Sequence, residues 1–389
     1  MANNRVYYAI QQVTFGKDGQ GSVGPRYAAH GVQSIGITTN FNLEQVFELG
    51  QISIYENVEG TPDVEVTMSK VLDGYIPLYC LATADQTNGP ALSQRVDSDV
   101  KTFVQLGIWD EANQSAGENS STAGSWVEMS GLVVSSVSYN FPLDDNFSED
   151  ITLVGNYKVW KSGTEKNTVS TSCGVSYHPS GVGGAFGGNN DAPIGSGGVN
   201  RRENIQFATS LAGTHSGDFS ILPEDIPGVG TSGQRGTAHV SSITVSTDVS
   251  REDIFELGAK LPYAKSVTFP VEVTCDIEVT TASGDLINAL DDCSEDAACN
   301  TKSNLNERRI RIATCEGLRI WLGQKNKLAS VSYGGGDAGG GNATVTYSYS
   351  NFNDFTVMHV ADSGSNGGST SGSTWWSDKE NYIGTGVYY

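Results

Sequence analysis

The chain has 389 residues, a length at which two or three domains are expected. Its 44 acidic and 23 basic residues leave a net charge of -21, so the surface as a whole should repel nucleic acid phosphates and anionic lipid. This charge argues against a protein that grips DNA or RNA and against a membrane partner.

Cysteine usage and the amino terminus indicate a reducing compartment. Six cysteines in so long a chain do not make a disulfide framework, and we expect free thiols. The amino terminus lacks the apolar core of a secretory signal, and no segment is apolar over the length of a membrane span. We therefore expect a soluble protein in the cytoplasm of the cell that makes it.

The first third of the chain contains strand patterns and one short helix signal. Apolar residues alternate with polar ones in 6–15 and again in 64–69, where Glu65 lies on the polar side. Between them, Asn42 is followed three residues later by Gln45, which is typical of a helix start, and Gly50 is suited to end that helix. This pattern predicts one or two helical turns with Phe47 packed inward.

The next elements are a second helix, two strand regions and a linker. We expect a helix near 70–81, although Gly74 and Pro77 weaken it, and strands at 131–141 and 151–160. From 161 to 236 the chain is rich in Gly, Ser, Asn and Pro with apolar residues at intervals. This composition predicts a linker followed by an extended arm that adheres to a neighbouring surface.

The last third repeats the order of the first. Ser250, Phe255 and Gly258 occupy the positions of Asn42, Phe47 and Gly50 and predict a second short helix. In the strand predicted at 271–280 one side is apolar, and the other carries the acidic side chains Glu272, Asp276 and Glu278. A helix near 284–290 and strands at 309–321, 327–333 and 343–350 complete the expected elements.

The two helix signals belong to an internal duplication. Residues 32–50 align with 240–258 without a gap, a spacing of 240 − 32 = 208 residues, and nine of the nineteen positions are identical, including a final Phe-Glu-Leu-Gly. A Val-Glu-Val-Thr follows each copy, at 64–67 and 271–274. The spacing is far above that of a solenoid repeat, so each copy should be a whole domain.

The duplication predicts the domain organisation and a symmetric assembly. We expect a first domain at 1–160, the linker and arm at 161–236, and a second domain at 237–389. Two like domains in tandem can occupy two like positions in a ring, so a trimer of such chains would mimic a hexamer. A hexameric ring of whole chains remains the alternative.

No catalytic or ligand-binding constellation emerges from the sequence. The five histidines are scattered, the glycine-rich 334–341 lacks the lysine of a phosphate loop, and the acidic pairs lie in turn-like sequence without a calcium-loop pattern. We therefore expect no enzyme activity, no cofactor and no metal.

The repeated Phe-Glu-Leu-Gly segment, its following Val-Glu-Val-Thr strand and the opening Asn-Arg-Val-Tyr-Tyr-Ala-Ile-Gln-Gln-Val-Thr-Phe resemble tail tube proteins of long-tailed bacteriophages. The resemblance implies an all-β fold with short helices, in which two tandem tail-tube-like β-sandwich domains contribute strands to a ring-shaped β-barrel. It also implies a structural virion protein whose rings stack into the conduit for DNA, with tape measure, sheath or terminator proteins as partners. The expected location is the virion tail, after assembly in the host cytoplasm.

An acidic channel lining is consistent with this resemblance. DNA must slide through such a channel without adhering, and fixed negative charge keeps phosphates off the wall. We identify Glu65, Glu272, Asp276 and Glu278 as candidate lining residues. A solvent-facing or ring-to-ring position is the alternative for these side chains.

Two other classes of protein fit the sequence. A fibre or surface protein that binds glycans could use the aromatic residues Trp375, Trp376, Tyr388 and Tyr389. A surface-layer protein fits the acidity and the Gly, Ser and Thr content but not the missing signal.

Overall fold

The computed structural model describes residues 6, 11–17, 26–83, 101–108, 125–162, 198–205, 223, 226, 239–281, 284–285, 287, 307–336 and 341–359. Nearly all of these lie in or between β-strands, and the one described α-helix, α1 (Leu78–Thr83), is short. The prediction of an all-β fold with short helices is confirmed.

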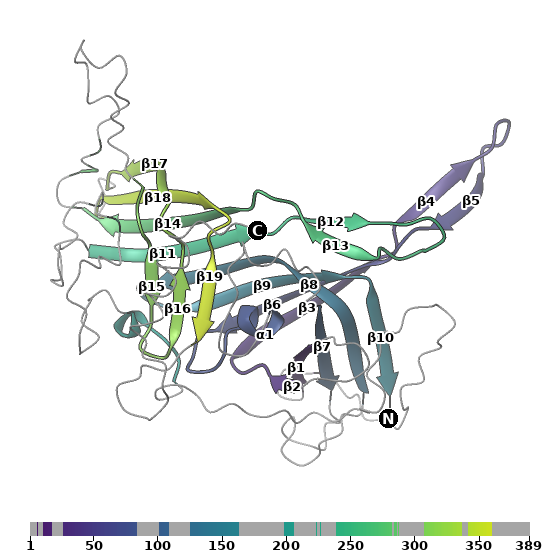
Figure 1. Cartoon of the computed structure of the whole chain (residues 1–389), viewed down its shortest axis with the longest axis horizontal. Coiled ribbons are helices and arrows are strands. Elements are labelled where there is room, and N and C mark those ends of the chain that lie inside the picture. The colour runs from purple at the N-terminus through teal and green to yellow at the C-terminus, as the bar shows by residue number, and fades with distance from the viewer. Residues whose placement is uncertain are drawn as a thin grey trace, which may run out of the picture.

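A continuous antiparallel sheet runs through both halves of the chain (Figure 1). The first half contributes four strands in the spatial order β3-β6-β9-β8, and the second half contributes four in the order β11-β14-β18-β17. The halves are joined where β8 pairs with β11. The strands are β3 (Val32–Asn40), β6 (Asp63–Val71), β9 (Ser148–Gly155), β8 (Ser125–Pro142), β11 (His239–Asp248), β14 (Glu272–Thr280), β18 (Thr344–Phe352) and β17 (Lys327–Gly334).

The two groups of four strands match down to their irregularities. The register between β3 and β6 shifts between Val32 and Ser34, and that between β11 and β14 shifts at the equivalent positions, Val240 and Ser242. A second pair of shifts lies in the middle of β8 and at the start of β17, within 134–136 and 328–330. Such bulges are built into a strand's sequence, so the internal duplication extends to the structure.

The Val-Glu-Val-Thr motifs are an exception to this match. Ile35 pairs with Met68, whereas its equivalent Ile243 pairs with Ile277. The structural offset of these strands is therefore 277 − 68 = 209, while the motifs at 64 and 271 are 207 residues apart. Because side chains alternate with a period of two, the two-residue slip leaves every side chain on its expected face.

A second, outer layer covers the apolar face of the sheet. In the first half it consists of β1 (Gln11–Lys17), β2 (Arg26–Ala28), β7 (Thr102–Ile108), the beginning of β8 and β10 (Tyr157–Ser162). In the second half it is the small sheet of β15 (Arg311–Ala313), β16 (Leu318–Trp321) and β19 (Thr356–His359). Each half is thus a β-sandwich, and β8 belongs to the outer layer before Gly131 and to the inner sheet after it.

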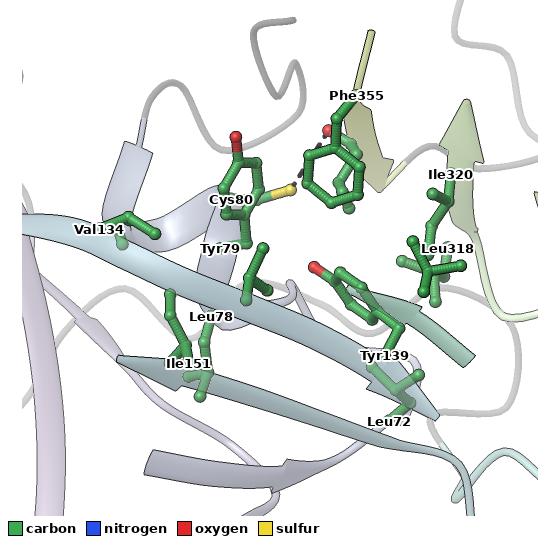
Figure 2. Packing of buried hydrophobic residues seen from close by; sticks show 14 of the residues in the cluster. Leu72, Leu78, Tyr79, Cys80, Val134, Tyr139, Ile151, Leu318, Ile320 and Phe355 are labelled. Carbon is green, nitrogen blue, oxygen red and sulfur yellow. Dashed lines mark hydrogen bonds between the residues drawn. The ribbon is translucent and has the colours of Figure 1, made fainter. Parts of the chain in front are cut away.

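Helix α1 lies between the layers where the two halves meet (Figure 2). The ring of Tyr79 in α1 packs edge-on against Phe355, just before β19, with 5.4 Å between the centroids, and Phe355 also lies against Tyr139 of β8. All three side chains are fully buried. Aromatic packing therefore ties the apolar faces of the two halves together.

A buried carboxylate holds the start of α1. The Glu149 side chain accepts hydrogen bonds from the backbone N–H groups of Leu78 and Tyr79, at 2.7 and 2.9 Å, and from the Tyr139 hydroxyl at 2.7 Å. Burial raises the pKa of Glu149, although these bonds and nearby Lys70 act in the opposite direction. The N-terminal N–H groups of so short a helix need such a partner.

Most predicted strands are present, with changes at their limits. The strand expected at 6–15 is β1, although Val6 lies outside it and 7–10 fall outside the described residues. The single strands expected at 151–160 and 309–321 are each interrupted, forming β9 with β10 and β15 with β16. The strands β3 and β11 were not predicted, because Ser and Thr occupy so many of their positions that the apolar side is marked by few residues.

The helices were predicted less well. At 70–81 the strand β6 continues to Val71, and α1 begins only at Leu78, directly after Pro77, which is favourable at a helix start. Of the helix expected at 284–290, the described residues 284, 285 and 287 are not helical.

Of the predicted linker and arm, the structure describes 161–162, 198–205, 223 and 226. Asn200 pairs its backbone with Leu72 and Phe147 of the first half, and Asn204 accepts a hydrogen bond from the Cys315 N–H of the second. This part of the arm adheres to both halves. The domain boundaries at 160 and 236 stay predictions.

Candidate assembly interfaces

The inner face of the sheet is polar across both halves. One row of paired residues crosses it through hydroxyl, carboxylate and ammonium side chains, in the order Ser34, Ser69, Asp150, Ser138, Ser246, Thr274, Ser350 and Lys327. A hollow of about 470 Å³ lies on this face where the halves meet, lined in part by Ser136, Thr152 and Asp248. The polar face is therefore concave at the junction.

All four predicted lining residues lie on this polar face. Glu65 is exposed on β6, and Glu272 and Asp276 are exposed on β14. Glu278 is partly buried, and one of its carboxylate oxygens accepts a hydrogen bond from the Ser242 hydroxyl at 3.1 Å. Whether this face lines a channel stays a prediction.

Other carboxylates share the face. They are Asp63, Asp150 and Asp248. Among the described strands of the sheet, one lysine or arginine side chain lies on this face, that of Lys327. The excess of negative charge would repel an approaching polyanion.

The predicted short helices at the repeated motif are wrong: both segments are β-hairpins. Residues after Asn42 form β4 (Leu43–Phe47) and β5 (Ile54–Glu59), and residues after Ser250 form β12 (Arg251–Ile254) and β13 (Ala264–Val267). Asn42 and Ser250 close the hairpin bases through their carbonyl oxygens, which accept from Gly60 N–H and Thr268 N–H at 3.1 and 3.0 Å. Phe47 and Phe255 are exposed rather than packed inward.

Two physical reasons explain the error. The Asn42 side-chain amide donates to the Thr61 carbonyl oxygen and to Asp63 on the returning strand, so it ties two strands together instead of capping a first turn. Gly50 and Gly258 have the positive φ, +94° at each, that a glycine ending a helix would also have, but each lies in a tight turn at a hairpin tip. In such a turn glycine follows a residue of ordinary φ, here Leu49 or Leu257.

The hairpin tips are apolar and fully exposed. Leu49 and Leu257, at equivalent places in the two turns, have no part of their side chains covered, and the same holds for Ile52 beside the first turn. Figure 1 shows β4 and β5 projecting beyond the rest of the described chain. Repeated exposed leucines at equivalent tips indicate a contact surface rather than scattered surface residues.

The two edges of the sheet, β3 and β17, are equivalent to the two strands that join at its centre. Strand β3 corresponds to β11 and β17 corresponds to β8. Phe41, directly after β3, is 60% exposed, whereas its equivalent Val249 is 2% exposed and donates its N–H to Ser135. Tyr333 of β17 is 54% exposed, whereas its equivalent Tyr139 is fully buried. The edge strands thus display apolar side chains that the central junction covers.

Two further features are absent from the described residues. They contain no group of histidine, cysteine, aspartate and glutamate side chains that could hold a metal ion. Within the same residues, no helix has the length and apolar character needed to cross a membrane. The aromatic residues near the carboxyl end, Trp375, Trp376, Tyr388 and Tyr389, fall outside the described ranges.

No protein-family model matches the chain, and no curated protein matches its sequence. Among solved structures, the chain is similar to one described as the cryo-EM structure of the anti-feeding prophage cap, a tube terminating cap. The identity is 13% and the TM-score 0.27, over 42% of this chain and 95% of that one. At this level the likeness assigns neither a fold nor a role to the chain.

Proposed function

We propose that the chain is a structural subunit of a phage-type tail, and specifically a tail tube protein that closes into rings and stacks into a conduit for DNA. The observation that carries this proposal is the equivalence of the free edges β3 and β17 to the paired strands β11 and β8. A junction already formed inside the chain can be repeated between chains.

The internal junction gives the register of the proposed one. In the β8–β11 pair, Ser138 lies opposite Ser246, and these residues correspond to Ser332 of β17 and Thr38 of β3. Copies would join with Ser332 of one opposite Thr38 of the next. Such a head-to-tail contact makes a ring when its rotation closes, and closure removes both exposed sheet edges.

The stagger of the strands supports closure into a barrel. The row of paired residues that starts at Ser34 on β3 crosses β6, β9 and β8 and reaches Ser246 on β11. The residue of β11 that is equivalent to Ser34 is Ser242. The row is therefore displaced along the strand by 246 − 242 = 4 residues over four strands. One residue per strand gives a strand tilt of about 35°, within the range of closed barrels. Three copies would form a wall with a backbone diameter of about 45 Å, wide enough for duplex DNA.

Side-chain chemistry supports the same arrangement. The polar, acidic face is concave and would line the channel, where it would keep phosphates from adhering. Exposed Leu49 and Leu257 would contact the next ring in the stack. The role is structural, without catalysis or cofactor, and the further partners are tape measure, sheath or terminator proteins in a virion tail assembled in the host cytoplasm.

Placing a charge at the edge tests ring closure. Phe41→Asp should leave the free chain stable to within about 0.5 kcal/mol, because Phe41 is largely exposed there. In the junction the carboxylate would be buried, which should cost about 3 kcal/mol and raise the concentration needed for assembly about a hundredfold. The measurement is sedimentation velocity over a concentration series.

Leu143→Asp is the matched control, since Leu143 is also exposed but follows β8 at the junction inside the chain. It should assemble like the unmodified protein. Unchanged assembly of Phe41→Asp would contradict the proposed closure.

A further inference from the structure

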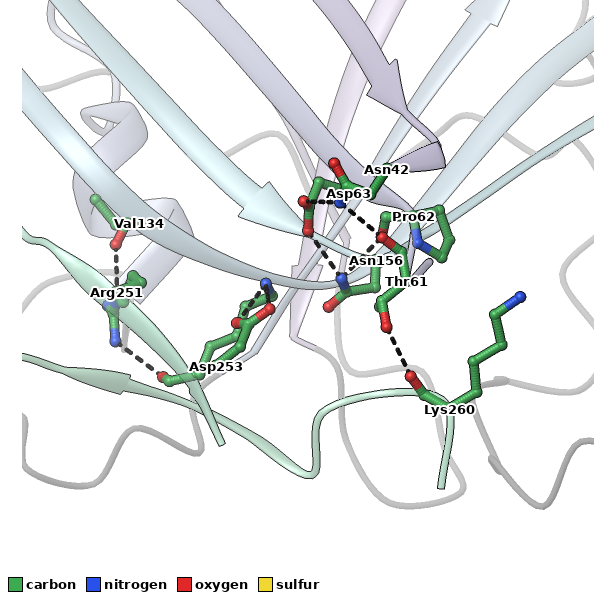
Figure 3. Close-up of polar contacts among 10 residues, drawn as sticks. Asn42, Thr61, Pro62, Asp63, Val134, Asn156, Arg251, Asp253 and Lys260 are labelled. Carbon is green, nitrogen blue, oxygen red and sulfur yellow. Dashed lines mark hydrogen bonds and ion pairs between the residues drawn. The ribbon is translucent and has the colours of Figure 1, made fainter. Parts of the chain in front are cut away.

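The β12–β13 hairpin lies across the first half of its own chain. The Arg251 side chain donates through Nε to the Val134 carbonyl oxygen in β8 at 2.9 Å. Farther along, the Lys260 carbonyl oxygen accepts a hydrogen bond from the Thr61 hydroxyl, at the base of the β4–β5 hairpin, at 2.7 Å. Figure 3 shows both contacts, which anchor the β12–β13 hairpin near its base and beyond its tip.

The β4–β5 hairpin has the same length but lacks such support among the residues that the structure describes. Its base closes between 42 and 60 and that of β12–β13 between 250 and 268, so in each hairpin the two base residues are eighteen positions apart (60 − 42 and 268 − 250). Every residue of β4 and β5 is exposed, whereas most residues of β12 and β13 are partly buried. The difference is what one expects if the surface beneath β4–β5 belongs to another molecule.

The internal contacts identify that surface. The constant spacing makes Ile52 the equivalent of Lys260, and Phe269 the equivalent of Thr61. Ile52 is fully exposed, and Phe269 is 40% exposed at the base of the β12–β13 hairpin. The contact inside the chain joins the Thr61 hydroxyl to a backbone carbonyl oxygen. At the equivalent positions between chains the side chains are Ile52 and Phe269, which are both apolar and both gain from burial.

We propose that the β4–β5 hairpin is an intersubunit strap that lies across the second half of a neighbouring copy, with Ile52 against that copy's Phe269. The inference rests on the proposed ring, because the same neighbour is the one whose β17 pairs with β3. Two contacts then hold neighbouring copies together in the ring. One is the pairing of β3 with β17 of the neighbour, and the other is the β4–β5 hairpin, which lies across the second half of that same neighbour.

Disulfide cross-linking of the full chain separates the strap from the ring. One variant carries Ile52→Cys with Phe269→Cys, and a second carries Thr38→Cys with Ser332→Cys to report the sheet pairing. After mild oxidation both should give a ladder on denaturing gels that ends at the number of chains in the ring. Ser138→Cys with Ser246→Cys, which lie opposite each other in the β8–β11 pair, is the positive control and should close within one chain, leaving a monomer band.

The outcomes are distinct. A ladder from the 38/332 variant without one from the 52/269 variant would overturn the strap and leave the ring standing. Absence of both ladders would overturn the ring and the strap together, and a 52/269 ladder alone would contradict the shared junction from which the strap is derived. Variants with a single introduced cysteine must remain unlinked, since a ladder from them would show that native thiols form it.

Discussion

At the scale of single residues, His359 makes folding sensitive to pH. Burial in β19 lowers the pKa of His359 to about 4, and the charge of Lys70 acts in the same direction. In the unfolded chain the pKa is about 6.5, so between these values the unfolded state binds a proton that the folded state does not. Stability is therefore full above pH 6.5 and is lost as the pH falls towards 4.

The expected loss attributable to His359 is about 2 kcal/mol between pH 7 and pH 5. His359→Asn should reduce the pH dependence of the unfolding free energy by this amount, measured by denaturant titration at both pH values. His239→Asn is the control, because His239 is exposed. Parallel pH profiles for His359→Asn and the unmodified protein would contradict the assignment.

The sequence predicts on which face of the sheet a side chain lies, but it does not predict which charged side chains are buried. Alternation placed Glu65, Glu272 and Asp276 correctly, because a strand with one apolar side allows only one orientation. Lys70 and Glu149 follow the same alternation, yet both lie on the buried side with charged and polar partners. The partners of Glu149 come from α1 and β8, whereas Lys70 contacts Asp73 and the Ile76 carbonyl oxygen in the loop before α1. None of these contacts follows from the alternation of apolar and polar residues.

At the scale of elements, the hairpin tips should control stacking. Leu49→Ser together with Leu257→Ser removes apolar surface that is fully exposed in the free chain, so folding should be unaffected. If the tips contact the next ring, the double variant should form rings but markedly shorter tubes, measured as length distributions by negative-stain electron microscopy. Leu143→Ser is the matched control, and an unchanged length distribution in the tip variant would contradict the stacking role.

The hairpins also show where local sequence signals fail. Asn42 and Ser250 are good helix caps, and Gly50 and Gly258 are good helix ends, but the same residue types serve turns and strand closures equally well. The distinguishing signal was the preceding alternation of Ile35 and Ile37, which makes a strand that continues directly into the hairpin. A single Gly with positive φ does not specify which element precedes it.

At the scale of the whole molecule, the duplication was the most reliable prediction. Nineteen residues of ungapped similarity indicated two like domains, and the described strands repeat with matching order and bulges. The sequence could not reveal that β8 joins β11, because pairing between domains depends on which edges meet in space. That junction is what turns a repeated domain into a candidate ring.

Cryo-electron microscopy of the purified, assembled protein tests the central claim most directly. We expect closed rings stacked into a hollow tube, with a continuous antiparallel wall in which β17 of one copy pairs with β3 of the next and Ser332 lies opposite Thr38. Discrete monomers, flat lattices, or rings whose copies meet through surfaces other than β3 and β17 would contradict it.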